Sequence, residues 1–184
     1  MITIYIVRHG ETDYNKESRY LGRADISLNS TGREQATELR RTIKNLHIDT
    51  VISSPLKRAV ETAKIILPDN EIATDYHFIE RSTGVYEGLT KKEASIKYPD
   101  FYKKNITRIF NEAPPKGETI HRVQERVFEG LDRIKNDYYD KNIIIITHAF
   151  IAKIVNKYFN PQLTDEDFFD FVLPNAQVQK YTIN

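Results

Sequence analysis

Two histidines in the chain directly follow apolar runs that resemble buried strands. The run at residues 2–7 leads into Arg8-His9-Gly10, and the run at residues 142–147 leads into His148. The carboxyl ends of parallel strands share one edge of a sheet, where open α/β folds bind their ligands. We therefore expect both imidazoles over one pocket. A charged surface loop is the alternative for Arg8-His9-Gly10. The polar or loop contexts of the remaining histidines are typical of structural or solvated side chains: His47, His77 and His121.

A third strand end brings a cation to the same edge. The β-branched run at 49–53 leads into Ser54-Pro55 and then Arg58, one turn into the next predicted helix. Taken alone, Arg58 is typical of an exposed helix residue and Glu80 of a surface carboxylate. The combination nevertheless suits phosphoryl transfer. Arginine pairs its N–H groups with phosphate oxygens, a neutral imidazole can attack phosphorus, and a carboxylic acid can protonate the leaving oxygen.

A metal site fits the sequence less well than phosphate chemistry. The chain has no His-Glu-x-x-His motif, no aspartate-rich loop and no P-loop lysine pattern. Cysteine is absent, which excludes thiolate ligands, disulfides and a cysteine nucleophile.

The composition of the 184 residues favours one domain with a sizeable core. The 27 basic and 26 acidic residues leave a net charge of +1, which argues against a nucleic-acid partner. No apolar run approaches the roughly 20 residues of a membrane span. The N-terminal run lacks a preceding basic residue and is broken by Arg8-His9, unlike a signal peptide. We expect a cytoplasmic protein, as a monomer or homodimer.

Strand patterns alternate with helix patterns along the chain. We predict strands at 2–7, 49–53, 71–75, 142–147, 171–173 and 178–183. Helices are predicted where apolar residues recur every three or four positions, at 31–46, 55–66, 120–134 and 149–158. Thr90 with Glu93 can start a further short helix, which Pro99 interrupts. Ser30 or Thr31 is expected to cap the first helix, and Pro55 to open the second. This alternation indicates an α/β fold with a mainly parallel sheet.

These residues resemble the histidine phosphatase superfamily, also called the phosphoglycerate-mutase-like family. The similarity is spread over several blocks in the family order, from residue 4 to about 152. The blocks are Arg8-His9-Gly10-Glu11-Thr12 with Asn15, then Arg19, Leu21-Gly22 and Asp25, then Leu28 to Gly32 with Gln35-Ala36, Ser53 to Ala59 with Thr62-Ala63, Glu80-Arg81 with Gly84 and Glu87-Gly88, Pro115 to Thr119, and Thr147-His148.

The resemblance implies a three-layer α/β/α sandwich and a phosphohistidine mechanism. His9 would be the nucleophile, and Arg8, Arg58 and His148 would form the phosphate pocket. Glu80 would act as general acid and then as the base that activates water. No metal or organic cofactor is implied. Further phosphate- or substrate-binding positions are expected at Asn15, Leu21, Gly22, Arg81 and Ala149.

The physical chemistry of these roles adds expectations of its own. His9 should be neutral, with its non-attacking nitrogen donating to a backbone carbonyl. His148 is more useful as a cation that touches phosphate. Glu80 should have a raised pKa so that it can hold a proton.

Three activities remain open for this family. The first is hydrolysis of a small phosphate ester by a metal-independent, acid-type phosphatase. The second is a phosphoglycerate-type mutase, and the third is binding of a phosphorylated ligand without turnover. Mutases of the superfamily carry a longer insertion, whereas only 36 residues separate Glu80 from Gly117. That short interval, with Glu87-Gly88 and Ala149, favours the phosphatase.

The substrate is less well indicated than the chemistry. Residues 81–116 are expected to form a substrate-covering insertion within the single domain 1–184, because loops after strand ends decide specificity in such sheets. This segment has several basic residues that could recruit additional negative charge, although a solvated helix face is the simpler interpretation: Arg81, Lys91, Lys92, Lys103, Lys104 and Arg108. Sugar phosphates, phosphoglycerates, nucleotide-like phosphates and α-ribazole phosphate all remain open.

Overall fold

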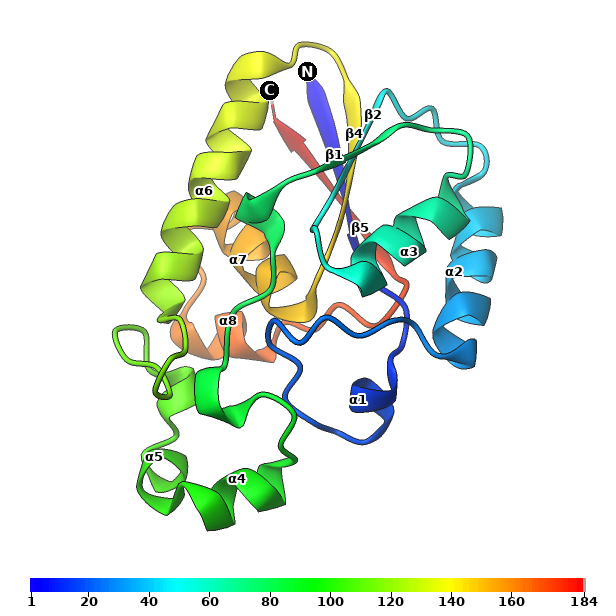
Figure 1. The fold of residues 1–184 in the computed structure, drawn as a ribbon. Coiled ribbons are helices and arrows are strands. Elements are labelled where there is room, and N and C mark those ends of the chain that lie inside the picture. The colour runs from blue at the N-terminus through cyan, green and yellow to red at the C-terminus, as the bar shows by residue number, and fades with distance from the viewer. Residues whose placement is uncertain (184) are drawn as a thin grey trace.

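A five-stranded sheet forms the centre of the computed structural model, which describes residues 1–183 (Figure 1). Its order is β3-β2-β4-β1-β5; the first four strands are parallel, and β5 runs antiparallel to β1. The predicted mainly parallel sheet is thus confirmed. The strands are β1 (Ile2–Arg8), β2 (Thr50–Ser53), β3 (Ile72–Thr74), β4 (Asn142–Thr147) and β5 (Val178–Ile183).

Helices cover both faces of the sheet and complete the expected three-layer α/β/α sandwich. Helices α2 (Ser30–Ile43) and α3 (Lys57–Ile66) pack on one face, and α6 (Ile120–Asp137) and α7 (Ala149–Phe159) on the other (Figure 1). Alternate isoleucines of β4 serve the two layers, which explains why this strand is continuously apolar. Within residues 1–183, no helix is both long and apolar enough to cross a membrane.

A small third cluster lies outside the sandwich, where α4 (Lys91–Lys97) and α5 (Pro99–Lys103) project beyond the sheet (Figure 1). Its buried residues are Tyr86, Ala94 and Ile106. The predicted helix start is confirmed, because the Thr90 hydroxyl accepts from the Glu93 N–H within a capping box. Pro99 interrupts the helix as expected and opens α5. The remaining short helices are α1 (Asp13–Lys16) and α8 (Asp165–Asp170).

Three helix boundaries differ from the sequence prediction. Asn29, rather than Ser30 or Thr31, caps α2, and its amide oxygen accepts from the Gly32 N–H at 2.8 Å. The same helix ends at Ile43, which leaves Leu46 outside it and exposed. Pro55 does not open α3, because Leu56 is the N-cap residue and the helix starts at Lys57.

The secondary structure of residues 165–173 was predicted least well from the sequence. Residues 171–173 do not form a strand, and the short helix α8 before them was not predicted. Thr164 and Asp167 form a capping box that starts α8, and Phe168 fills the core. Leu173 is buried and uses its carbonyl to bind an arginine side chain instead of a neighbouring strand.

Candidate active site

The sheet register brings the two strand-end histidines together. Arg8 of β1 is opposite Thr147 of β4, so the next residue of each strand, His9 and His148, emerges at the same edge. The His9 backbone N–H donates to the Thr147 carbonyl at 3.0 Å. The imidazole centroids are 5.2 Å apart, and both side chains are buried.

The hydrogen bonds of His9 favour one neutral tautomer. Its Nδ1 lies 2.6 Å from the Gly10 carbonyl oxygen, and the Arg58 Nε–H donates to its Nε2 at 3.3 Å. The proton therefore belongs on Nδ1 and the lone pair on Nε2. Burial first, and then the Arg58 cation, hold the pKa of His9 well below its usual value. His9 is thus a neutral imidazole with a basic Nε2.

Arg58 is the largest fully buried side chain among the described residues, and it links His9 to a neighbouring loop. Besides His9, it donates to the Gly22 carbonyl at 2.8 Å and the Ala24 carbonyl at 2.6 Å. Burial lowers the pKa of Arg58 to about 10, so it remains a cation at neutral pH. Its charge therefore lies directly beside the imidazole that would attack phosphorus.

His148 differs from the expected cation. Its Nε2 lies 2.7 Å from the Ser54 hydroxyl, and its buried Nδ1 has no hydrogen-bond partner within the described chain. Burial first, and then Arg58, hold the pKa of His148 well below its usual value, so it is neutral without ligand. If the Ser54 hydroxyl donates to Nε2, Nδ1 carries the proton and is a donor that lacks an acceptor.

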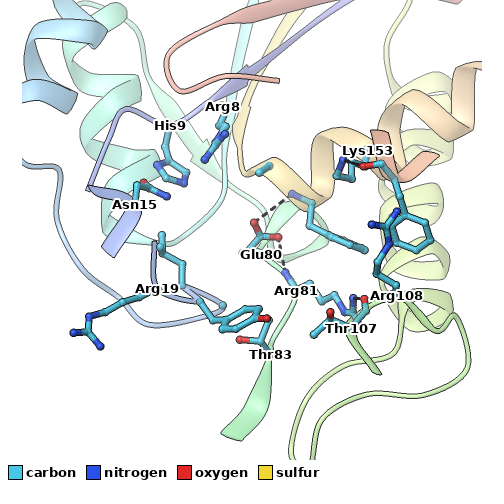
Figure 2. Close-up of a pocket in the computed structure, with 16 residues that line it drawn as sticks. Arg8, His9, Asn15, Arg19, Glu80, Arg81, Thr83, Thr107, Arg108 and Lys153 are labelled. Atoms are coloured by element: carbon cyan, nitrogen blue, oxygen red, sulfur yellow. Dashed lines mark hydrogen bonds between the residues drawn. The ribbon is translucent and has the colours of Figure 1, made fainter. Parts of the chain in front are cut away.

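Glu80 lies across the cavity from His9 (Figure 2). Its carboxylate accepts from the Arg81 N–H at 2.8 Å and from the Phe150 N–H at 3.4 Å. Burial of the carboxylate raises the pKa of Glu80, against the opposing effects of these hydrogen bonds and Arg58. The predicted direction of this pKa shift is confirmed. Since the cavity leaves the side chain half-buried, Glu80 can still exchange protons with a ligand or water.

Arg8, His9 and Glu80 border a cavity of about 390 Å³ at the carboxyl edge of the sheet. All five residues that the sequence indicated for substrate binding line it, together with Arg8, His9 and Glu80. Arg58 and His148 do not line it; they are completely buried beside His9. The five substrate-binding candidates are Asn15, Leu21, Gly22, Arg81 and Ala149.

The sequence did not predict that residues 173–176, near the C-terminal end of the described chain, bind Arg8 and His9. Arg8 Nη1 donates to the Leu173 carbonyl at 3.0 Å, and the Asn175 side-chain amide donates to the His9 carbonyl at 2.9 Å. The Ala176 N–H donates to the Arg8 carbonyl at 3.0 Å. These contacts join residues more than 160 positions apart, and no local sequence pattern predicts them.

The far end of the cavity was also only partly foreseen. Of the basic residues suggested for recruiting negative charge, Arg81 and Arg108 line the cavity, whereas Lys103 and Lys104 are exposed elsewhere. Lys91 lines a neighbouring cavity. Lys153 of α7 was not singled out, because its helical spacing is that of an ordinary surface residue. Phe150, Phe169 and Thr107 complete this end of the lining.

The donor set of the site favours anion binding over metal binding. Residues 1–183 hold no group of three or more His, Cys, Asp or Glu side chains that could bind a metal ion. Arg8 can instead bind a phosphate ester in the cavity, with the buried Arg58 cation close by beside His9. The basic Nε2 of His9 can attack phosphorus, and the Glu80 carboxyl, with its raised pKa, can protonate the leaving group.

Comparison with known proteins supports this chemistry. A family model described as the histidine phosphatase superfamily (branch 1) matches residues 4–184. "Uncharacterized phosphatase PhoE" of Bacillus subtilis is 37% identical over 154 residues, which cover 81% of this chain and 72% of that protein. "Phosphoglycerate mutase-like protein 4" of Arabidopsis thaliana is 37% identical over 155 residues, covering 82% and 67%. The solved structure of Bacillus stearothermophilus YhfR superposes with a TM-score of 0.91 at 26% identity, covering 100% of this chain and 92% of that one.

Proposed function

The chain belongs to the histidine phosphatase superfamily, and on that premise we propose that it hydrolyses a small phosphate monoester through a phosphohistidine on His9. One observation carries this proposal furthest. His9 is held as a neutral imidazole with its Nδ1 against the Gly10 carbonyl, beside the buried Arg58 cation and across the cavity from Glu80.

In the first proposed step, His9 Nε2 attacks phosphorus while the bond to the ester oxygen breaks. Protonated Glu80 donates its proton to that oxygen, so the alcohol leaves neutral. The raised pKa of Glu80 supports this role, because the carboxyl must still hold a proton when substrate binds. The step ends with a phosphohistidine and an ionised Glu80.

In the second step, ionised Glu80 takes a proton from water as the water oxygen attacks phosphorus. The bond from phosphorus to Nε2 breaks, inorganic phosphate leaves, and Glu80 is again protonated. His9 returns to the same neutral tautomer, since its Nδ1–H donates to Gly10 throughout. Arg8 and Arg58 stabilise the charge on the transferring group in both steps.

We propose that no metal takes part, because the positive charge around phosphorus comes from arginine. His148 would add a donor through Nδ1, and a bound dianion would raise its pKa and favour the cation that the ligand-free protein disfavours. The chain would then be a metal-independent phosphatase of the acid type. Residues 81–116 would cover the bound substrate. The protein would act in the cytoplasm.

Hydrolysis is favoured over the mutase and over binding without turnover. The similar Bacillus subtilis protein is named a phosphatase, and the one from Arabidopsis thaliana is named mutase-like. The short interval between Glu80 and Gly117 favours the phosphatase. Binding without turnover has little support, because the chain has residues suited to act as nucleophile, proton donor and phosphate-binding cations: His9, Glu80, Arg8 and Arg58.

The test is trapping of the phosphoenzyme. Brief mixing with a ³²P-labelled ester and quenching in base should leave label on the protein, and acid should release it, because a phosphoramidate is stable in base and labile in acid. His9→Ala should remove the label and lower kcat/KM by roughly 10⁴-fold or more. His47→Ala, which alters a largely exposed histidine, should retain both. Full turnover by His9→Ala would exclude the mechanism.

A further inference from the structure

The end of the cavity away from His9 carries positive charge that the proposed reaction does not use. Arg81, Arg108 and Lys153 line it, and Figure 2 shows them on the other side of Glu80 from Arg8 and His9. Among the described residues of this lining, Glu80 is the only carboxylate. The cavity therefore holds more cationic charge than one phosphate group needs.

Arg81 is the most deeply buried of these cations. It is 3% exposed, its Nε–H donates to the Glu118 carbonyl at 2.8 Å, and its Nη1 donates to the Thr107 carbonyl at 2.7 Å. Its Nη2 is buried without a hydrogen-bond partner in the described chain. A buried donor without an acceptor is costly, and a ligand oxygen would satisfy it.

Lys153 and Arg108 are held by neutral groups. Lys153 Nζ donates to the Phe169 carbonyl at 2.7 Å and also to the Phe171 carbonyl, and the guanidinium carbon of Arg108 lies 4.4 Å from the Phe169 ring centroid. Within residues 1–183 neither side chain forms a salt bridge. Burial first, and then Arg108, lower the pKa of Lys153 against the opposing effect of Asp170, so the two cations repel each other.

A purely structural role for Lys153 is the alternative, because its carbonyl partners lie at the end of α8. Carbonyl dipoles orient an ammonium group but do not cancel its charge, and an ammonium has three donors. Lys157 lies one turn further along α7 and donates to the Leu163 carbonyl, yet it does not line the cavity. Lys157 thus binds a backbone carbonyl as Lys153 does, but it lies outside the cavity.

We propose that Arg81, Arg108 and Lys153 form a second anion subsite, which binds a carboxylate or second phosphate on the organic part of the ester. This inference rests on the proposed function, since it concerns the substrate of the same site. An oxyanion there would relieve the repulsion among the cations and satisfy the Arg81 donor. Phe150 and Phe169 flank the subsite and would contact the carbon skeleton of a small metabolite.

Competition against p-nitrophenyl phosphate hydrolysis tests the subsite, because every ester that binds yields an inhibition constant whether or not it is turned over. Two matched pairs separate the second charge from the rest of the ligand. The pair 3-phosphoglycerate and glycerol 3-phosphate tests a carboxylate, and the pair fructose 1,6-bisphosphate and fructose 6-phosphate tests a phosphate. In at least one pair, the ester with the second charge should bind roughly 10- to 100-fold more tightly.

Arg108→Gln and Lys153→Met should each reduce that ratio by about tenfold, while leaving the competing strength of the singly phosphorylated partner little changed. Lys103→Gln and Lys157→Met are the matched controls and should keep the ratio of the unaltered protein. The ratio compares two ligands on one protein sample, so a variant that folds less well still reports it. Arg108→Gln decides alone if Lys153→Met does not fold, because Arg108 is exposed.

The outcomes separate the subsite from the proposed reaction. Ratios near one in both pairs, or ratios that survive both substitutions, would overturn the subsite while p-nitrophenyl phosphate is still hydrolysed. No hydrolysis of any ester would overturn the proposed function, and the subsite as a substrate site with it.

Discussion

His9 keeps its lone pair because its surroundings oppose protonation. Burial and the Arg58 cation lower its pKa, while the Gly10 carbonyl holds the proton on Nδ1. Glu80 has the opposite need, and burial raises its pKa above the ordinary 4.5. The free protein is therefore active where His9 is deprotonated and Glu80 protonated, between a lowered histidine pKa and a raised glutamate pKa.

A pH profile of kcat/KM should reflect this pair. Activity should fall at low pH only as His9 gains a proton, well below the ordinary histidine pKa of 6.5, and should fall as pH rises through the raised pKa of Glu80. Glu80→Gln should lower kcat/KM by roughly 10²- to 10⁴-fold on an alkyl phosphate and remove the alkaline fall. On p-nitrophenyl phosphate, whose leaving group needs no proton, the loss in the phosphorylation step should be small.

Measurement of kcat/KM from pH 4 to 9 on both esters checks this assignment. An equal loss on the two esters, or an alkaline fall that persists in Glu80→Gln, would show that another group donates the proton. Phosphoenzyme formation with p-nitrophenyl phosphate serves as the control, because His9 should still be labelled in this variant.

At the scale of elements, the loop after Glu80 depends on a close backbone approach. Gly84 has φ of +57°, and a Cβ there would lie 2.1 Å from the Pro115 carbonyl oxygen. The Val85 N–H donates to that same oxygen at 3.0 Å. Gly88 also has positive φ, +80°, but a Cβ there would meet no atom nearer than the Tyr14 hydroxyl at 3.5 Å. The two glycines form a matched pair.

Gly88→Ala should lower the free energy of unfolding by about 1–2 kcal/mol, because alanine is strained at positive φ. Its Tm should fall by roughly 2–8 °C. Gly84→Ala adds a backbone clash and should lower Tm further, with a larger fall in kcat/KM because the loop carries Glu80. Calorimetry and steady-state kinetics on both variants measure the difference. Equal effects in the two variants would show that the contact with Pro115 does not fix the loop.

The elements explain what the sequence could predict about the fold and the site. Uninterrupted isoleucines identified β4, and the apolar spacing of α6 fixed its face, because burial on both sides or on one side imposes those patterns. The parallel sheet then required His9 and His148 to meet. The cap of α2 was misplaced by one or two positions, because Asn29, Ser30 and Thr31 all suit a cap and only the three-dimensional contact selects one.

Long-range contacts were beyond sequence reasoning. The Arg8 guanidinium donates to the Leu173 carbonyl, and the Asn175 side-chain amide donates to the His9 carbonyl. Both acceptors are backbone carbonyls, which every residue possesses, so the sequence does not single them out. Lys153 was overlooked for a similar reason. Its helical position resembles that of Lys157, and only the placement of α8 makes it part of the cavity.

At the scale of the whole molecule, ligand binding and stability should be coupled. Inorganic phosphate binds the assembled site and not the unfolded chain, so phosphate at 100 times its Kd should stabilise the protein by about 2.7 kcal/mol and raise Tm by roughly 5–10 °C. EDTA should change neither this shift nor the rate of hydrolysis, because the proposed site uses arginine charge.

Thermal unfolding with and without phosphate and EDTA measures this coupling. Arg8→Met should lose most of the phosphate-dependent shift, whereas the exposed His47→Ala variant should keep it. Activity that disappears with EDTA and returns with a divalent ion would refute the metal-free proposal.

The strand order has a consequence for the growing polypeptide on the ribosome. β1 leads into His9, the proposed nucleophile, but its neighbours in the sheet are β4 and β5, which are translated long after it. The backbone at Arg8 and His9 also needs its hydrogen bonds from Asn175 and Ala176. Until those residues leave the exit tunnel, β1 has two open edges and no catalytic geometry. Nascent chains should therefore gain activity only after β5 has left the exit tunnel, and a holding chaperone should find its main target in β1.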